Sequence, residues 1–285
     1  PVSLRRGCSM GGIIWLASYP KSGNTWLRAF LHNLLRNPEK PANINQLDQF
    51  CLGDSQAQWY YRVSDHKDLT GVPNEAVAQL RRQVHDAFTK VHPDSVFAKT
   101  HNFLGQAFGA ELVTMEHTVG AIYVLRNPLD MAVSMADHFG TDFDGAIEML
   151  ADPQAMTPSG DLNAFEFYNT WSKHVASWTA GKNEGLMHVR YEDMTNKPAQ
   201  TFRRIAKFLG LNPSKARLDK AIRFSSFKVL QGQEKKDGFR ERSGHSERFF
   251  RSGKLGQWRQ VLSKSQIDQV VSDHHEQMER FGYLP

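Results

Sequence analysis

The chain has 285 residues, 40% of them hydrophobic and 23% charged, and its formal net charge is +5. A chain of this length and composition can bury a substantial core, which excludes a predominantly disordered protein. The positive charge suits an anionic ligand but is too small and too dispersed to indicate nucleic acid binding. Two cysteines, Cys8 and Cys51, exclude a disulfide framework, and no apolar run approaches the about 20 residues that cross a bilayer. We therefore expect a cytoplasmic protein that binds neither nucleic acid nor a membrane.

Apolar strands, turns and amphipathic helices alternate along the chain, which is typical of a parallel sheet flanked by helices. Buried strands are predicted at residues 13–17, 96–99, 121–125 and 187–190. Helices are predicted at residues 25–35, 75–90, 128–139, 164–180, 199–209 and 265–281. Residues 37–73, 140–162 and 231–252 lack clear periodicity and are expected to be long connections around a site. The prediction is a single α/β domain over residues 11–285, with a central parallel β-sheet flanked by helices, after a tail at residues 1–10.

Residues 19–26, Tyr-Pro-Lys-Ser-Gly-Asn-Thr-Trp, lie between the first predicted strand and the first predicted helix. The free N–H groups and the dipole of a helix start favour an anion at this point. A glycine permits close approach of the backbone, a lysine adds positive charge, and an indole can stack on adenine. The loop lacks the Gly-Lys-Ser/Thr sequence that binds nucleoside triphosphates. The candidate binding residues are Lys21, Ser22, Gly23, Asn24, Thr25 and Trp26.

This eight-residue string resembles the 5′-phosphosulfate-binding loop of the cytosolic sulfotransferase family, which usually has Thr at the position of Asn24. The resemblance implies a P-loop nucleotide-hydrolase-like fold and a sulfuryl donor, 3′-phosphoadenosine-5′-phosphosulfate (PAPS). The product would be adenosine 3′,5′-bisphosphate (PAP). The implied reaction is in-line transfer of the sulfuryl group to a hydroxyl or amine of a small-molecule acceptor.

Two further segments resemble the family's 3′-phosphate elements. Arg126 ends a predicted strand, and Ser134 follows eight residues later on the next predicted helix. Near the C-terminus, Arg251, Ser252 and Gly253 resemble an Arg-Lys-Gly sequence, with Ser252 at the position of the usual Lys. A guanidinium offers a planar fork to a phosphate and a hydroxyl adds one donor. The resemblance also implies adenine contacts from Tyr191, Ser225 and Phe227.

His101 follows the second predicted strand in the string Lys99-Thr100-His101, which resembles the family's catalytic segment. An imidazole is suited to act as general base near neutral pH. The resemblance implies that Lys21 supports the leaving group and that Lys99 holds the sulfuryl oxygens. No clustered carboxylates, His-x-x-x-His pair or Cys-x-x-Cys pair indicates a metal site, so no metal is expected.

Two other functions stay open at this point. A kinase of the P-loop type has the same general architecture, but the missing Gly-Lys-Ser/Thr and metal-binding carboxylates disfavour it. A non-catalytic nucleotide-binding or nucleic acid-binding protein is supported only by the basic charge. Lys21 and His101 together favour an enzyme.

The sequence leaves the acceptor undefined. An aromatic set suits a phenolic or steroid-like ring and comprises Phe50, Trp59, Tyr60, Tyr61, Phe139 and Phe143. An acidic set suits a cationic or polyhydroxylated acceptor and comprises Asp137, Asp142, Asp144, Glu148 and Asp152. The aromatic set is equally consistent with loop anchors, and for the acidic set a solvated surface loop is favoured over an acceptor site.

The family has a small dimer motif, Lys-x-x-x-Thr-Val-x-x-x-Glu, just after the tryptophan that corresponds to Trp258. This chain has Arg259, Ser263, Lys264 and Asp268 at that spacing. Lys264 replaces the Val and would place a charge against its own symmetry mate. We therefore predict a monomer, or a dimer through another surface.

Overall fold

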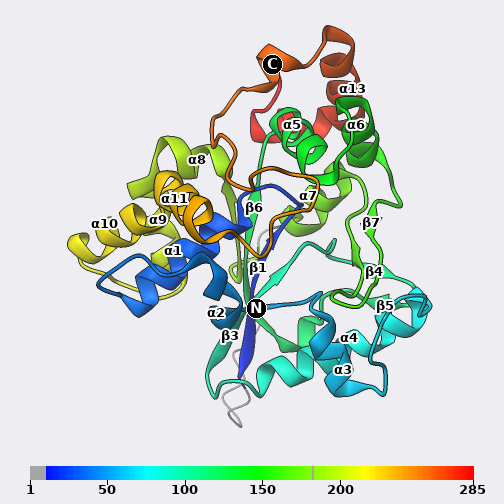
Figure 1. The fold of residues 1–285 in the computed structure, drawn as a ribbon, viewed down its shortest axis with the longest axis vertical. Coiled ribbons are helices and arrows are strands. Elements are labelled where there is room, and N and C mark those ends of the chain that lie inside the picture. The colour runs from blue at the N-terminus through cyan, green and yellow to red at the C-terminus, as the bar shows by residue number, and fades with distance from the viewer. Residues whose placement is uncertain (1–10, 182) are drawn as a thin grey trace.

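The computed structural model describes residues 11–181 and 183–285, so the predicted tail and Cys8 lie outside the described residues. A parallel five-stranded sheet forms the centre of the molecule (Figure 1). In spatial order its strands are β2 (Cys51–Gly53), β3 (Ser95–Thr100), β1 (Gly12–Ser18), β6 (Thr118–Leu125) and β9 (Leu186–Arg190). The predicted α/β class and the four predicted strands are confirmed, while the short strand β2 was not predicted.

Helices cover both faces of this sheet (Figure 1). The α-helices of the described residues are α1 (Asn24–Arg36), α2 (Leu47–Phe50), α3 (Ala57–Val63), α4 (Asn74–Thr89), α5 (Pro128–Phe139), α6 (Phe143–Ala151), α7 (Trp171–Thr179), α8 (Tyr191–Asn196), α9 (Pro198–Phe208), α10 (Lys215–Phe224), α11 (Phe227–Asp237), α12 (Trp258–Val261) and α13 (Lys264–Phe281). Two small hairpins pair β4 (Gln106–Ala107) with β5 (Ala110–Glu111) and β7 (Met156–Thr157) with β8 (Glu166–Phe167).

The strands divide their side chains between two cores, because successive residues of a strand point to opposite faces. Trp15 and Tyr123 belong to the core under α4, α5 and α7. Leu16 and Val124 belong to the core under α1, α9 and α10. Both faces are therefore buried, which explains why these strands are continuous apolar runs in the sequence.

The strand register brings three chain segments to one edge of the sheet. Ala17 of β1 lies opposite Thr100 of β3 on one side and opposite Tyr123 of β6 on the other. The carboxyl ends of these parallel strands therefore meet, and the residues that follow them can share one site.

The helix predicted at residues 164–180 is wrong in its first half, since α7 begins only at Trp171. Glu166 and Phe167 form β8 instead, and the Phe167 N–H donates to the Asn102 side-chain oxygen at 2.8 Å. The Thr170 hydroxyl then caps α7 by accepting from the Lys173 N–H. Tertiary hydrogen bonds thus override an apparent helical repeat.

The three stretches expected to be connections also contain helices. Residues 37–73 hold α2 and α3, residues 140–162 hold α6, and residues 231–252 hold most of α11. α2 and α3 are too short for a hydrophobic repeat to be detected. α11 has 11 residues but buries only Leu230 and Glu234, so it lacks an apolar face.

Candidate active site

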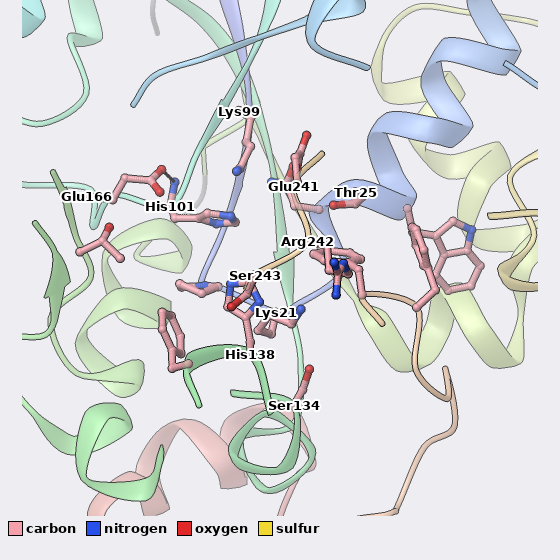
Figure 2. A pocket seen from close by; sticks show the side chains of 18 of the residues that line it. Lys21, Thr25, Lys99, His101, Ser134, His138, Glu166, Glu241, Arg242 and Ser243 are labelled. Atoms are coloured by element: carbon pink, nitrogen blue, oxygen red, sulfur yellow. Dashed lines mark hydrogen bonds between the residues drawn. The ribbon is translucent and has the colours of Figure 1, made fainter. Parts of the chain in front are cut away.

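A cavity of about 720 Å³ opens where β1, β3 and β6 end (Figure 2). This is the position at which open parallel sheets bind ligands. The structure brings most of the predicted site residues to its wall, from segments more than 200 residues apart in the chain. They are Lys21, Gly23, Asn24, Thr25, Trp26, Lys99, His101, Arg126, Ser134, Tyr191, Phe227, Arg251, Ser252 and Gly253.

The loop between β1 and α1 is held in a tight conformation. Gly23 caps α1 with φ of 107°, a conformation that side chains rarely adopt. A Cβ atom there would also lie 2.6 Å from the Tyr191 ring. The same tyrosine lies under the Arg126 guanidinium, 4.4 Å from its carbon to the ring centre, and edge-on to Trp26. Gly23 thus lets the loop, Arg126 and two aromatic rings converge.

His101 is oriented by the end of β1. Its Nδ1 lies 2.7 Å from the Ser18 carbonyl oxygen, which accepts hydrogen bonds only. This contact assigns the proton to Nδ1 and leaves Nε2 with a free lone pair. Burial, followed by the charge of Lys99, holds the pKa of His101 well below its ordinary value. The imidazole is therefore neutral and can take up a proton at Nε2.

Several cations share the cavity with this imidazole (Figure 2). Burial, followed by the charge of Arg126, lowers the pKa of Lys21 to about 8. The Lys21 ammonium lies 3.9 Å from the centre of the Phe249 ring. One guanidinium nitrogen of Arg126 donates to the Lys21 carbonyl at 3.0 Å, while its Nε is buried without a partner. Such a cluster favours a bound polyanion, which would relieve the repulsion and supply the missing acceptor.

Two buried carboxylates that the sequence analysis missed hold the C-terminal segment against the cavity. Asp130 of α5 accepts from the Gly256 N–H at 2.7 Å. Glu234 of α11 accepts from the N–H groups of Phe249 and Phe250 at 2.6 and 2.9 Å. These contacts keep residues 251–253 close to Ser134. An acidic residue inside the otherwise apolar start of α5 is the sequence signal that could have identified Asp130.

Arg28 and Glu241 form a second support that was not predicted. Arg28 is buried in α1 and pairs with Glu241 through both guanidinium ends, at 2.8 and 2.5 Å. It also donates to the Thr25 hydroxyl at 3.2 Å. Burial opposes ionisation of Glu241, but the charge of Arg28 outweighs it and lowers the pKa of Glu241 to about 2. This pair holds the loop that contains Glu241 over the cavity.

Contrary to expectation, the hydroxyl groups of Ser22 and Ser225 do not line the cavity. Ser22 points into the core towards the Met131 sulfur, and Ser225 donates back to the Ala221 carbonyl of α10. Asn24 does line the cavity, but its amide nitrogen donates to the Leu16 carbonyl at 2.8 Å. The amide therefore fixes the loop to β1.

Most of the candidate acceptor residues also lie elsewhere. Phe139 is the member of the aromatic set that reaches the cavity; Trp59 packs on Phe88, and Tyr60 is fully buried. No member of the acidic set lines the cavity in the part of the chain that the structure describes. Asp142, for example, caps α6 by accepting from the Gly145 N–H.

Residues 11–181 and 183–285 contain no group of three or more His, Cys, Asp or Glu side chains placed to hold a metal ion. No helix within these residues is long and apolar enough to cross a membrane.

Comparison with known proteins decides the family. A family model described as a sulfotransferase domain matches residues 13–282. The chain belongs to the sulfotransferase family. The expected PAPS-dependent sulfotransferase activity is thereby confirmed, and the kinase alternative is not favoured.

Two relatives cover most of this sulfotransferase. Dog sulfotransferase 1B1 is 25% identical over 89% of this chain and 79% of its own length. Cytosolic sulfotransferase 6 of Arabidopsis thaliana is 26% identical over 91% of this chain and 77% of its own length. Among solved structures, mouse sulfotransferase SULT7A1 complexed with PAP has a TM-score of 0.62 at 20% identity, covering 94% of this chain and 84% of that one. A retinol dehydratase in complex with androsterone and PAP has a TM-score of 0.63 at 18% identity, covering 93% and 80%.

Proposed function

We propose that this sulfotransferase transfers the sulfuryl group of PAPS to a hydroxyl or amine of a small molecule, with His101 as general base. The observation that carries this role is the hydrogen bond from Nδ1 to the Ser18 carbonyl, which leaves Nε2 free to accept a proton. A base with a depressed pKa is unprotonated at neutral pH and is available in every turnover.

The residues of the cavity fit PAPS. The loop at residues 21–26 would hold the 5′-phosphosulfate, and Trp26, Tyr191 and Phe227 would enclose the adenine. The 3′-phosphate would lie among Arg126, Ser134 and residues 251–253, which line the same cavity. When bound, PAPS supplies an activated sulfuryl group with a phosphate as leaving group.

The side chains of this site divide the remaining work. His101 accepts the acceptor's proton at Nε2, and the Ser18 carbonyl stabilises the imidazolium that forms. Lys21 and Lys99 place positive charge in the same cavity, where negative charge develops on the oxygens of the transferred and leaving groups. The lowered pKa of Lys21 also lets it give up a proton more readily than an ordinary lysine.

We further propose a cytoplasmic location, because some relatives are named as cytosolic sulfotransferases. The acceptor is proposed to be a small molecule, since guinea pig relatives are named for hydroxysteroids.

Transfer of labelled sulfate from PAPS to an acceptor panel, with and without EDTA, tests the reaction directly. Calorimetry should show tighter binding of PAP than of ATP with Mg²⁺, because Arg126, Ser134 and Arg251 line the cavity where the 3′-phosphate would lie, and the described residues contain no group of three side chains placed to hold a metal ion. Loss of transfer in EDTA, or preference for ATP with Mg²⁺, would contradict the proposal.

A further inference from the structure

A carboxylate lies beside the proposed base on the wall of the cavity. Glu166 of β8 accepts from the His101 backbone N–H through Oε1 at 3.1 Å (Figure 2). Glu166 is 8% exposed and lines the same cavity as the imidazole. None of the functions assigned above uses this residue, although a buried carboxylate without a cationic partner is costly.

The backbone on both sides of Glu166 is fixed. The Phe165 carbonyl accepts from the buried Arg81 guanidinium. The Phe167 N–H donates to the Asn102 side chain, and the Phe167 carbonyl accepts from the Phe103 N–H at 2.8 Å. Since Asn102 directly follows His101, the carboxylate and the imidazole are held by the same contacts. A side chain oriented in this way can select a ligand with little loss of entropy on binding.

The second oxygen of Glu166 is available to a ligand. Among the described residues Oε2 has no hydrogen-bond partner, and Lys99 and Arg81 act on the carboxylate only from beyond ion-pair distance. Oε2 is also not one of the fully buried unpartnered atoms, and Glu166 lines the cavity. Burial raises the pKa of Glu166, so a donor that reached this oxygen would stabilise its ionised form.

The wall around Glu166 carries polar side chains beside Pro158, Leu162, Ala164 and Tyr168. This wall is formed by the turn after β2 and by the segment that joins β7 to β8. Two backbone hydrogen bonds connect these segments, one from the Ala164 N–H to the Ser55 carbonyl and one from the Ala57 N–H to the Leu162 carbonyl. The polar side chains on this wall are Ser55, Gln56, Thr157 and Asn163. Such a lining suits an acceptor with several hydrogen-bonding groups better than an apolar ring alone.

We propose that Glu166 selects the acceptor by accepting a hydrogen bond from a second donor, an O–H or a positively charged N–H, close to the hydroxyl that His101 deprotonates. The acceptor class is therefore an amino alcohol or a polyol, including their phenolic forms. This inference rests on the sulfotransferase reaction proposed above. Because Glu166 also holds the His101 backbone, its role in selection has to be separated from a role in positioning.

Glu166→Gln makes that separation. The glutamine side-chain oxygen can still accept from the His101 N–H, while the negative charge is lost. Asp161→Asn is a matched control, because it removes one negative charge from the same connection between β7 and β8. Asp161 is exposed and does not line the cavity.

Three phenols that share one reacting hydroxyl serve as probes: 3-methylphenol, 3-(hydroxymethyl)phenol and 3-(aminomethyl)phenol. For each probe, kcat/KM with PAPS and binding to the PAP-saturated protein by thermal shift are measured for the wild type and both variants. The binding measurement reports selection even where transfer is slow.

We expect the wild type to prefer the probes that carry a second donor. Glu166→Gln should lower this preference by about ten- to a hundredfold, as expected for the loss of a charge-assisted hydrogen bond, with a smaller loss for 3-methylphenol, which has no second donor. A loss confined to the aminomethyl compound identifies an ammonium, and a loss that includes the hydroxymethyl compound identifies a polyol. Asp161→Asn should match the wild type for all three probes.

Equal losses for all three probes would show that Glu166 only positions His101 and would overturn the inference, as would unchanged preference. A failure of the reaction itself gives a different result, namely no transfer from PAPS to any probe and no stabilisation by PAP.

Discussion

The side of the cavity proposed to bind PAPS, here called the cofactor side, and the side proposed to bind the acceptor, the acceptor side, are built in different ways. The cofactor side uses short segments that each follow a strand or begin a helix, such as residues 19–26 and 126–134. The acceptor side is assembled from β3, the turn after β2 and the β7–β8 hairpin, which meet only in the folded chain. An anion can be bound by a local backbone conformation, whereas acceptor selection needs side chains from several distant segments.

The two sides also differ in what supports them. On the cofactor side, carboxylates such as Asp130 and Glu234 bind backbone N–H groups of the C-terminal segment. On the acceptor side, Asp54 is fully buried and bonds to Arg81, His85, Thr100 and Asn102. Thr100 and Asn102 flank His101, so this ionic network fixes the position of His101. Substitutions on the cofactor side should therefore affect mainly PAP binding, and substitutions on the acceptor side should affect mainly catalysis.

The largest effect is expected from the base. His101→Ala should lower kcat by about 10²–10⁴-fold, because the acceptor hydroxyl then loses the group that takes its proton. PAP affinity, measured by calorimetry, should stay close to that of the wild type. His275→Ala, at an exposed site on α13, is the control and should change neither kcat nor PAP affinity. Near-normal turnover of His101→Ala would remove His101 from the mechanism.

Asp54→Asn should cost about 3–5 kcal/mol of unfolding free energy, because it leaves Arg81 buried without its ionic partner. Burial opposes ionisation of Asp54, but Arg81 and His85 outweigh it and lower the pKa of Asp54 to about 2, below its usual 3.8. This stabilisation is therefore present above about pH 4 and lost as the pH falls towards 2.

Urea unfolding between pH 2 and 7 checks this prediction, and Asp54→Asn should show a weaker pH dependence than the wild type. Asp86→Asn breaks an exposed ion pair with Lys90 instead and should cost under about 0.5 kcal/mol. Similar costs for the two variants would mean that the buried network does not support the acceptor side.

On the cofactor side, PAP should stabilise the protein more than AMP does. At about 100 times its dissociation constant, PAP should add roughly 2.7 kcal/mol, measured as a shift in Tm. AMP at the same concentration lacks the phosphate expected near Arg126, Ser134 and Arg251 and should add much less. Ser134→Ala should narrow the difference. Equal shifts from both nucleotides would argue against a 3′-phosphate site.

The smallest effect is expected for the oligomeric state, which substitution of Lys264 should leave unchanged. Lys264 lies exposed at the start of α13 and pairs with Asp268 at 2.5 Å. We predict a monomer because this charged residue stands where the family's dimer motif has a valine. Light scattering should give a monomer mass for the wild type and for Lys264→Glu alike. A dimer that Lys264→Glu dissociates would show that this segment is an interface after all.

The residues of the cofactor side could be predicted from the sequence where they lie in short contiguous motifs. Gly23, Lys21 and Arg126 lie in short strings whose spacing carries the chemistry, and buried parallel strands are continuous apolar runs. Asp130 was missed because its partner, Gly256, lies 126 residues away. Arg28 and Glu241 were missed for the same reason, being 213 residues apart.

The acceptor side was not predictable in the same way. In the sequence Phe167 continues a helical repeat with Trp171, but its backbone hydrogen bonds go to Asn102 and Phe103 and make it a strand residue. The position of Glu166 follows from that strand, so the error in secondary structure hid the carboxylate beside His101. Hydrophobic periodicity in the sequence indicates which face of an element is apolar, but it does not indicate which residue a backbone N–H or carbonyl will bond to in the folded chain.

The central place of β1 has a consequence for protein engineering. Its neighbour β3 leads to His101, the proposed base, and its other neighbour β6 leads to Arg126, which is proposed to bind the 3′-phosphate of PAPS. The connection at residues 158–165 belongs to the acceptor wall and contacts neither the loop at residues 19–26 nor the segment at residues 249–258 through any hydrogen bond of the described residues. Exchange of this connection is therefore a route to retargeting the enzyme to new acceptors while its use of PAPS is retained.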